Sequence, residues 1–145
     1  MAAERTARVT WHGDLPHGNG VIDKTGSGAL SNLPVSWAAR AERSDGKTSP
    51  EELIAAAHAS CFSMALAHSL AQGGHAPEQL EVSATVTFSL EGGPKITRSV
   101  LDVRATIPGL DAGAFAEVAQ GAGQNCPVSQ ALKGSVEIVV NPTLA

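Results

Sequence analysis

The two cysteines are the residues of this chain whose chemistry could define a function. Cys61 and Cys126 lie far apart in the sequence, and their number fits neither a zinc cluster nor the disulfide framework of a small secreted domain. A permanent disulfide is not expected in a reducing compartment. Two interpretations remain: two inert thiols in a core, or a pair that cycles between reduced and oxidised forms. Counting alone favours inert thiols.

The neighbours of the two cysteines predict different reactivities. Pro127 suits the first position of a helix, so Cys126 is expected at the helix N-cap, where backbone amides and the helix dipole favour a thiolate. Cys61 lies among apolar residues in the middle of a predicted helix, where burial should raise its pKa. Taken alone, these rules nominate Cys126 as the nucleophile.

The histidines near Cys61 allow two further hypotheses. His58 lies three residues before Cys61 and His68 seven after it, but the three lack a fourth ligand for zinc. A Cys-His hydrolase built from Cys61 and His58 lacks an oxyanion hole, because a mid-helix cysteine has no free backbone amides to form one. A packed, hydrogen-bonded core histidine is therefore the favoured interpretation of His58.

A long helix over Thr48 to Gly74 is the central element of the predicted fold. Ser49 and Glu52 form a capping box around Pro50 at its start, and Gly73-Gly74 end it. The residues between are apolar or small on nearly every side, which is typical of a buried helix. Its polar ends and its two histidines argue against a membrane span.

The other segments predict one α+β domain over residues 1–145, with antiparallel sheets and the long helix packed across them. Alternating apolar residues indicate strands before and after that helix. A single sheet covers only one side of a helix, so the remaining apolar surface predicts a homodimer. The predicted strands are Thr6–His12, Gly20–Lys24, Leu33–Arg40, Leu80–Leu90, Lys95–Pro108 and Ser135–Asn141, and two more helices are expected over Asp111–Gln124 and Pro127–Lys133.

Composition and charge exclude some classes of partner. With 43% hydrophobic and 17% charged residues, the chain has the composition of a globular protein. A net charge of −4 and a pI near 5.7 argue against nucleic acid as the main partner. The charged N-terminal segment lacks the apolar core of a signal peptide, so a cytoplasmic location without a membrane partner is expected.

Two sequence motifs resemble the osmotically inducible protein C (OsmC) family, within the OsmC/Ohr superfamily of thiol peroxidases. The first is SPEELIAAAHASCFSMALA around Cys61, and the second is NCPVSQAL around Cys126. The element order matches over nearly the whole chain, and the valine of the second motif is closer to the OsmC branch. Arg40, followed by a short loop and the Pro-Glu-Glu start of the helix, also fits the family pattern. Ala41 stands where an aromatic residue is frequent, which concerns the shape of the substrate pocket.

The resemblance implies an enzyme that reduces organic hydroperoxides to alcohols in oxidative stress defence. Cys61 would be the peroxidatic residue, and Cys126 would resolve its sulfenic acid to a Cys61-Cys126 disulfide. Arg40 and Glu51 would form the ion pair that activates the site. The family forms an intertwined homodimer with its sites at the subunit boundary. Glu51 is ten residues before Cys61, about 15 Å along the helix, so it would serve the partner's thiol.

The same interpretation assigns the remaining parts of the site. Apolar side chains from Leu53, Ile54, Phe62 and Met64 would favour alkyl or fatty-acid hydroperoxides. No metal, haem or flavin cofactor is needed, and an external dithiol, by family analogy a lipoylated protein, would reopen the disulfide. The alternative function is a non-catalytic, stress-related binding protein for small ligands on the same fold, with both thiols in the core.

Overall fold

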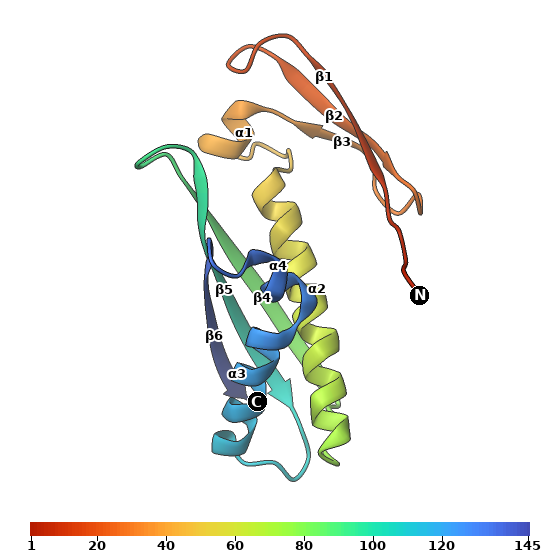
Figure 1. The fold of residues 1–145 in the computed structure, drawn as a ribbon, viewed down its shortest axis with the longest axis vertical. Helices are drawn as coiled ribbons and strands as arrows, with labels where there is room; N and C mark the ends of the chain where they lie inside the picture. Colours follow the sequence, from red (N-terminus) through yellow and green to blue (C-terminus); the bar gives the residue numbers. More distant parts are fainter. The chain divides into compact units, whose positions relative to one another are not determined.

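The computed structural model describes residues 1–145, which divide into two compact units at residue 50. The first unit holds a three-stranded antiparallel sheet in the order β1-β2-β3, drawn in red and orange in Figure 1. A short helix, α1, follows the sheet. The elements are β1 (Ala7–His12), β2 (Asn19–Thr25), β3 (Ser31–Val35) and α1 (Trp37–Ala41).

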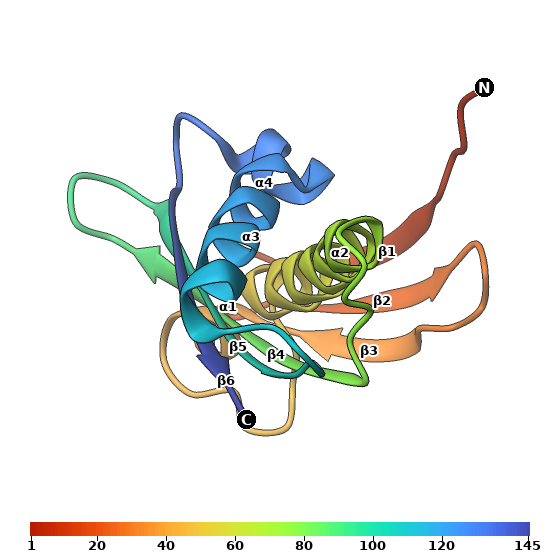
Figure 2. The same cartoon turned by 90° about the horizontal axis from the view of Figure 1, so that it is seen from below.

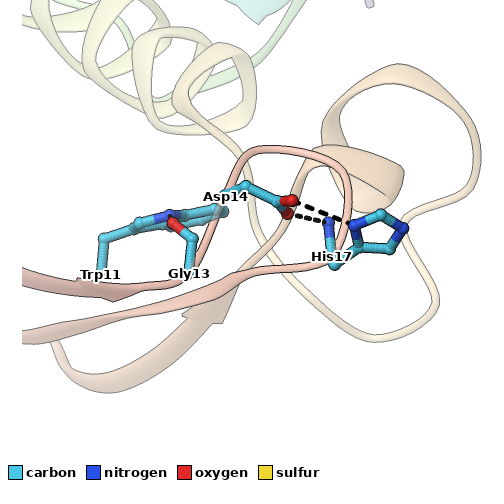
Figure 3. Close-up of polar contacts among 4 residues, drawn as sticks. All are labelled: Trp11, Gly13, Asp14 and His17. Atoms are coloured by element: carbon cyan, nitrogen blue, oxygen red, sulfur yellow. Dashed lines mark hydrogen bonds and ion pairs between the residues drawn. The ribbon is translucent and has the colours of Figure 1, made fainter.

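The turn between β1 and β2 is fixed by local hydrogen bonds (Figure 3). Trp11 Nε1 donates to the carbonyl of Gly13 at 2.9 Å, and Gly13 adopts a φ of +90° that favours glycine. Asp14 Oδ1 accepts the backbone N–H of His17 at 2.9 Å, and Asp14 Oδ2 lies 3.1 Å from His17 Nδ1. Asp14 and His17 are exposed. These contacts build a tight turn, as the glycine-rich sequence predicts.

The extended segment predicted over Leu33–Arg40 is wrong in its second half. The strand ends at Val35, because the Ser36 hydroxyl accepts the backbone N–H of Ala39 at 3.1 Å and caps α1. Arg40 therefore lies on one turn of helix, not at the end of a strand. The alternation of Val35, Trp37 and Ala39 is too short to distinguish a strand from a helix. The Ser36 cap favours the helix.

The long helix α2 spans Pro50–Gln72, close to its predicted bounds. At its end Gly74 has a φ of +83°, and the N–H of His75 donates to the carbonyl of Leu70 at 2.9 Å. That pairing is the glycine-based C-cap that the sequence predicts.

One stripe of α2 is buried within the chain: Glu51, His58, Phe62, Leu66 and Leu70. Many of the remaining residues of α2 are small or apolar and are exposed to solvent. Met64, for example, is 72% exposed. By length and composition α2 is apolar enough to cross a membrane. Its buried stripe packs into the core of the second unit.

The second unit contains a sheet in the order β4-β5-β6, and its last pairing corrects the prediction of purely antiparallel sheets. β4 (Gln79–Ser89) and β5 (Lys95–Thr106) form the predicted antiparallel hairpin, but β6 (Glu137–Leu144) runs parallel to β5. Parallel neighbours require a crossover connection. It is supplied by α3 (Ala112–Asn125) and α4 (Pro127–Leu132).

The core of the second unit lies between this sheet and the helices α2 and α3, which Figure 2 shows on the same side of the sheet. Helix α3 approaches the sheet closely, because a Cβ on Gly123 would collide with Val140 Cγ2 of β6. The fully buried side chains include Phe62 and Leu66 of α2, Leu101 and Ala105 of β5, and Phe115 and Ala119 of α3.

Candidate active site

Cys126 stands at the N-cap of α4, as predicted from Pro127. Its sulfur accepts the backbone N–H of Ser129 at 3.4 Å, and its own N–H donates to the carbonyl of Ala122 at the end of α3. The side chain has no exposed surface. The junction between two helices therefore holds this sulfur inside the protein.

Cys61 lies in the middle of α2 and is half-buried, so it is more accessible than predicted. Both cysteines are free thiols, and the Cys61 side chain is within hydrogen-bonding reach of Cys126. Burial raises the pKa of Cys61, while a hydrogen bond from the Val128 backbone lowers it and the neighbouring Cys126 raises it further. The tertiary structure thus places the two thiols together.

A buried row of polar side chains continues from Cys126. Ser129 Oγ lies 3.1 Å from Cys126 Sγ and 2.8 Å from His58 Nε2, and His58 Nδ1 lies 2.7 Å from Ser99 Oγ. Every member of the row is at most 1% exposed. Sequence reasoning missed Ser99 and Ser129. The available signal for Ser99 was a serine on the apolar face of β5, where Leu101, Val103 and Ala105 follow at every second position.

His58 is the packed, hydrogen-bonded histidine that the sequence favours. Burial lowers its pKa, so the neutral imidazole is the form that the interior stabilises. Both ring nitrogens contact serine hydroxyls. No ring nitrogen is left to act as a base on Cys61, which removes support from the Cys-His hydrolase hypothesis.

The other predicted site residues are Arg40 and Glu51. Arg40 is half-buried on α1, and Glu51 is 6% exposed in the first turn of α2. They belong to different units, so their ion pair stays a prediction. No group of three or more His, Cys, Asp or Glu side chains could hold a metal ion.

One of the four residues predicted to contact the substrate is fully buried. Phe62 has no exposed surface and packs the core, so it does not line a cavity open to solvent. Leu53 and Ile54 are half-buried and Met64 is exposed on α2. For these three residues the role stays a prediction.

Comparison with known proteins shows the family to which a chain with this fold and these two thiols belongs. The family model for OsmC-like proteins matches residues 43–141, and the chain belongs to the OsmC-like family. It is 38% identical over 139 residues to a protein of Escherichia coli (strain K12) named peroxiredoxin OsmC, covering 95% of this chain and 96% of that protein. An organic hydroperoxide resistance protein of Xanthomonas axonopodis pv. citri is 30% identical over 95 residues, covering 64% of this chain and 65% of that protein.

Solved structures agree with this assignment. The organic hydroperoxide resistance protein OhrB of Bacillus subtilis superposes with a TM-score of 0.70 at 26% identity, covering 95% of this chain and 98% of that one. An organic hydroperoxide resistance protein from Elizabethkingia anophelis has the same fold, with a TM-score of 0.70 at 24% identity and full coverage of both chains. The α+β fold with its central helix is therefore that of the OsmC and Ohr proteins.

Proposed function

We propose that this protein reduces organic hydroperoxides to alcohols, with Cys61 as the peroxidatic residue and Cys126 as the resolving residue. The observation that carries the proposal is the contact between two free thiols, one in the middle of α2 and one at the N-cap of α4. The chain is a thiol-dependent peroxidase, in keeping with the names of its relatives.

The accessibility of the two thiols supports the order of their reactions. Local pKa rules nominate Cys126 as the first nucleophile, but Cys126 is fully buried and Cys61 is half-buried. A peroxide reaches the accessible sulfur first. The resolving thiol needs contact only with Cys61, and the buried position of Cys126 provides that contact.

The reaction balances with these two groups. The Cys61 thiolate attacks the terminal oxygen of the hydroperoxide, the O–O bond breaks, and the alkoxide takes a proton and leaves as alcohol. Cys61 is then a sulfenic acid. The Cys126 thiolate attacks the Cys61 sulfur, the S–O bond breaks, and the hydroxide leaves as water after taking a proton. The protein is oxidised to the Cys61-Cys126 disulfide.

Arg40 and Glu51 are proposed to activate Cys61. Burial raises the pKa of Cys61, so a cation near the sulfur is needed to keep a thiolate at neutral pH. The planar guanidinium of Arg40 can also hold peroxide oxygens, and Glu51 would fix its orientation. Leu53, Ile54 and Met64 would contact an alkyl or fatty-acid hydroperoxide.

The open surface of α2 supports a homodimer. Apart from its buried stripe, the helix exposes a small and apolar surface of Ala56, Ala57, Ser60 and Met64. A second copy of the chain would cover this surface, and Glu51 would then serve the site of the partner. We further propose a cytoplasmic role in oxidative stress defence, with an external dithiol such as a lipoylated protein reopening the disulfide.

Thiol titration tests the proposal against the alternative of a non-catalytic binding protein. The reduced protein is mixed with one equivalent of cumene hydroperoxide, and free thiols are counted before and after. The peroxidase loses two thiols per chain, whereas a binding protein with core thiols loses none. Steady-state rates with hydrogen peroxide, cumene hydroperoxide and a fatty-acid hydroperoxide, with a lipoyl dithiol as donor, then define the substrate class.

A further inference from the structure

The row of buried polar groups Ser99, His58, Ser129 and Cys126 has no role in the reaction as written above. Burying such groups is unfavourable unless each is hydrogen-bonded, and here the hydrogen bonds join them to one another and end at the sulfur of the resolving cysteine. The members come from four elements: β5, α2, α4 and the α3–α4 junction. A row assembled from so many elements and ending at a reacting atom suggests a function.

The protons in this row of hydrogen bonds can be arranged in two ways. A neutral imidazole has one donor and one acceptor nitrogen, and a hydroxyl can both donate and accept. If Nδ1 of His58 carries the proton, Nε2 accepts from the Ser129 hydroxyl, whose oxygen accepts from the Cys126 thiol. If Nε2 carries the proton, it donates to Ser129 Oγ, and the Ser129 hydroxyl donates to the sulfur. The first arrangement suits a Cys126 thiol and the second a thiolate.

We propose that Ser129 and His58 form a proton relay that activates Cys126 for the resolving step. Cys126 gives its proton to Ser129 Oγ, and Ser129 gives its own proton to His58 Nε2. The thiolate attacks the Cys61 sulfur while His58 holds the proton. When the S–O bond breaks, the hydroxide leaves from half-buried Cys61 and takes a proton from water. His58 afterwards releases its proton to water, so the step forms one disulfide and one water with no net gain or loss of protons. This inference rests on the proposed peroxidase function.

The surroundings of His58 fit a temporary proton acceptor. Burial lowers its pKa, so the imidazolium is unstable and returns the proton readily. The row ends at Cys126, which is next to the titratable thiol of Cys61, and the two serines are neutral. The carboxyl group of Glu51 is also buried, about two turns before His58 on α2.

Rapid mixing with one equivalent of cumene hydroperoxide separates the two steps of the reaction. Dimedone trapping and mass spectrometry measure the Cys61 sulfenic acid, and non-reducing analysis measures the disulfide. Ser129→Ala should leave sulfenic acid formation within about twofold of wild type and slow disulfide formation by about 10²-fold, the usual contribution of a positioned acid or base.

A hydroxyl-preserving variant distinguishes the relay from a structural role. Ser129→Thr keeps the hydroxyl and should keep disulfide formation fast; Ser129 also borders a cavity of about 330 Å³. His58→Gln should slow the same step as Ser129→Ala does. Ser63→Ala and His68→Gln are the matched controls: Ser63 bonds a carbonyl of its own helix, and His68 is exposed on that helix. Both should behave as wild type.

Two results would overturn the relay. One is disulfide formation at the wild-type rate in Ser129→Ala, and the other is equal slowing in Ser129→Thr and Ser129→Ala. If Ser129→Ala does not fold, wild-type protein in D₂O provides the test, because the relay requires disulfide formation to slow more than sulfenic acid formation; equal slowing argues against it. Failure of the peroxidase proposal is distinct, since wild type would then lose no Cys61 thiol at all.

Discussion

Ser129 contacts the sulfur of Cys126 through two atoms. Its backbone N–H donates to Sγ at 3.4 Å, and its hydroxyl oxygen lies 3.1 Å from the same sulfur. Cys126 is thereby fixed in the interior, while Cys61 retains exposed surface. This difference in accessibility supports Cys61 as the residue that meets peroxide and Cys126 as the residue that resolves it.

Substitution of each cysteine should have a different kinetic result. Cys61→Ser should abolish hydroperoxide consumption, because no accessible thiolate remains. Cys126→Ser should allow one turnover and leave a sulfenic acid on Cys61, detectable with dimedone. Single-turnover peroxide assays with intact-mass measurement provide the check. Sustained turnover by Cys61→Ser would contradict the assignment of roles.

Removal of the Arg40 charge should slow the first step and shift its pH dependence. Burial raises the pKa of Cys61, and an adjacent opposite charge offsets such a shift by about 1–3 units. In Arg40→Gln the rate of cumene hydroperoxide reduction at pH 7 should fall about tenfold or more, and raising the pH should recover it. Arg43→Gln removes an exposed charge just after the same helix. Equal rates for the two variants would exclude Arg40 from the site.

Acid should destabilise the protein through His58. Burial lowers its pKa in the folded state below the ordinary value of 6.5, so the unfolded chain binds more protons as the pH falls through that value. Stability should therefore be lost below about pH 6.5, by at most about 1.4 kcal/mol per pH unit, until the folded-state pKa is reached. Urea unfolding at several pH values measures the slope. His58→Gln should flatten it and His68→Gln should not; an unchanged slope in His58→Gln would refute the prediction.

Two glycines of α3 should respond oppositely to alanine. A Cβ at Gly123 would collide with Val140 Cγ2, whereas nothing lies within 4 Å of a Cβ at Gly121. Gly123→Ala should destabilise the fold by about 1–3 kcal/mol through overpacking. Gly121→Ala should stabilise it by about 0.5–1 kcal/mol, because alanine loses less backbone entropy in a helix. Thermal unfolding compares the two, and equal effects would mean that α3 does not pack closely on β6.

A charge on the open surface of α2 should prevent dimer formation. Met64 is 72% exposed on this helix, and Leu90 is 55% exposed at the β4–β5 turn. Met64→Glu would place a charge in the proposed interface and should give a monomer at micromolar concentration. Leu90→Glu adds the same charge elsewhere and should leave the dimer intact. Sedimentation velocity distinguishes these outcomes, and a monomeric wild type would remove the dimer proposal.

Local sequence determines much of the architecture. Pro50 and Gly74 mark the ends of α2, the alternation after Gln79 marks the β4–β5 hairpin, and Pro127 places Cys126 at an N-cap. These signals act within a few residues, so a sequence alone displays them. Trp37–Ala41 shows the limit of such reasoning, because one serine cap converts a short alternating segment into a helix.

The sequence by itself identified the two cysteines, the helix that carries Cys61 and, through its motifs, the family. The tertiary structure decided which groups meet. Cys61 and Cys126 come together because the α3–α4 crossover brings α4 beside α2, and the same crossover makes β6 parallel to β5. The contacts of His58 with Ser99 and Ser129 span 41 and 71 positions of the chain. Such long-range contacts depend on how the helices pack on the sheet, and no local pattern encodes that packing.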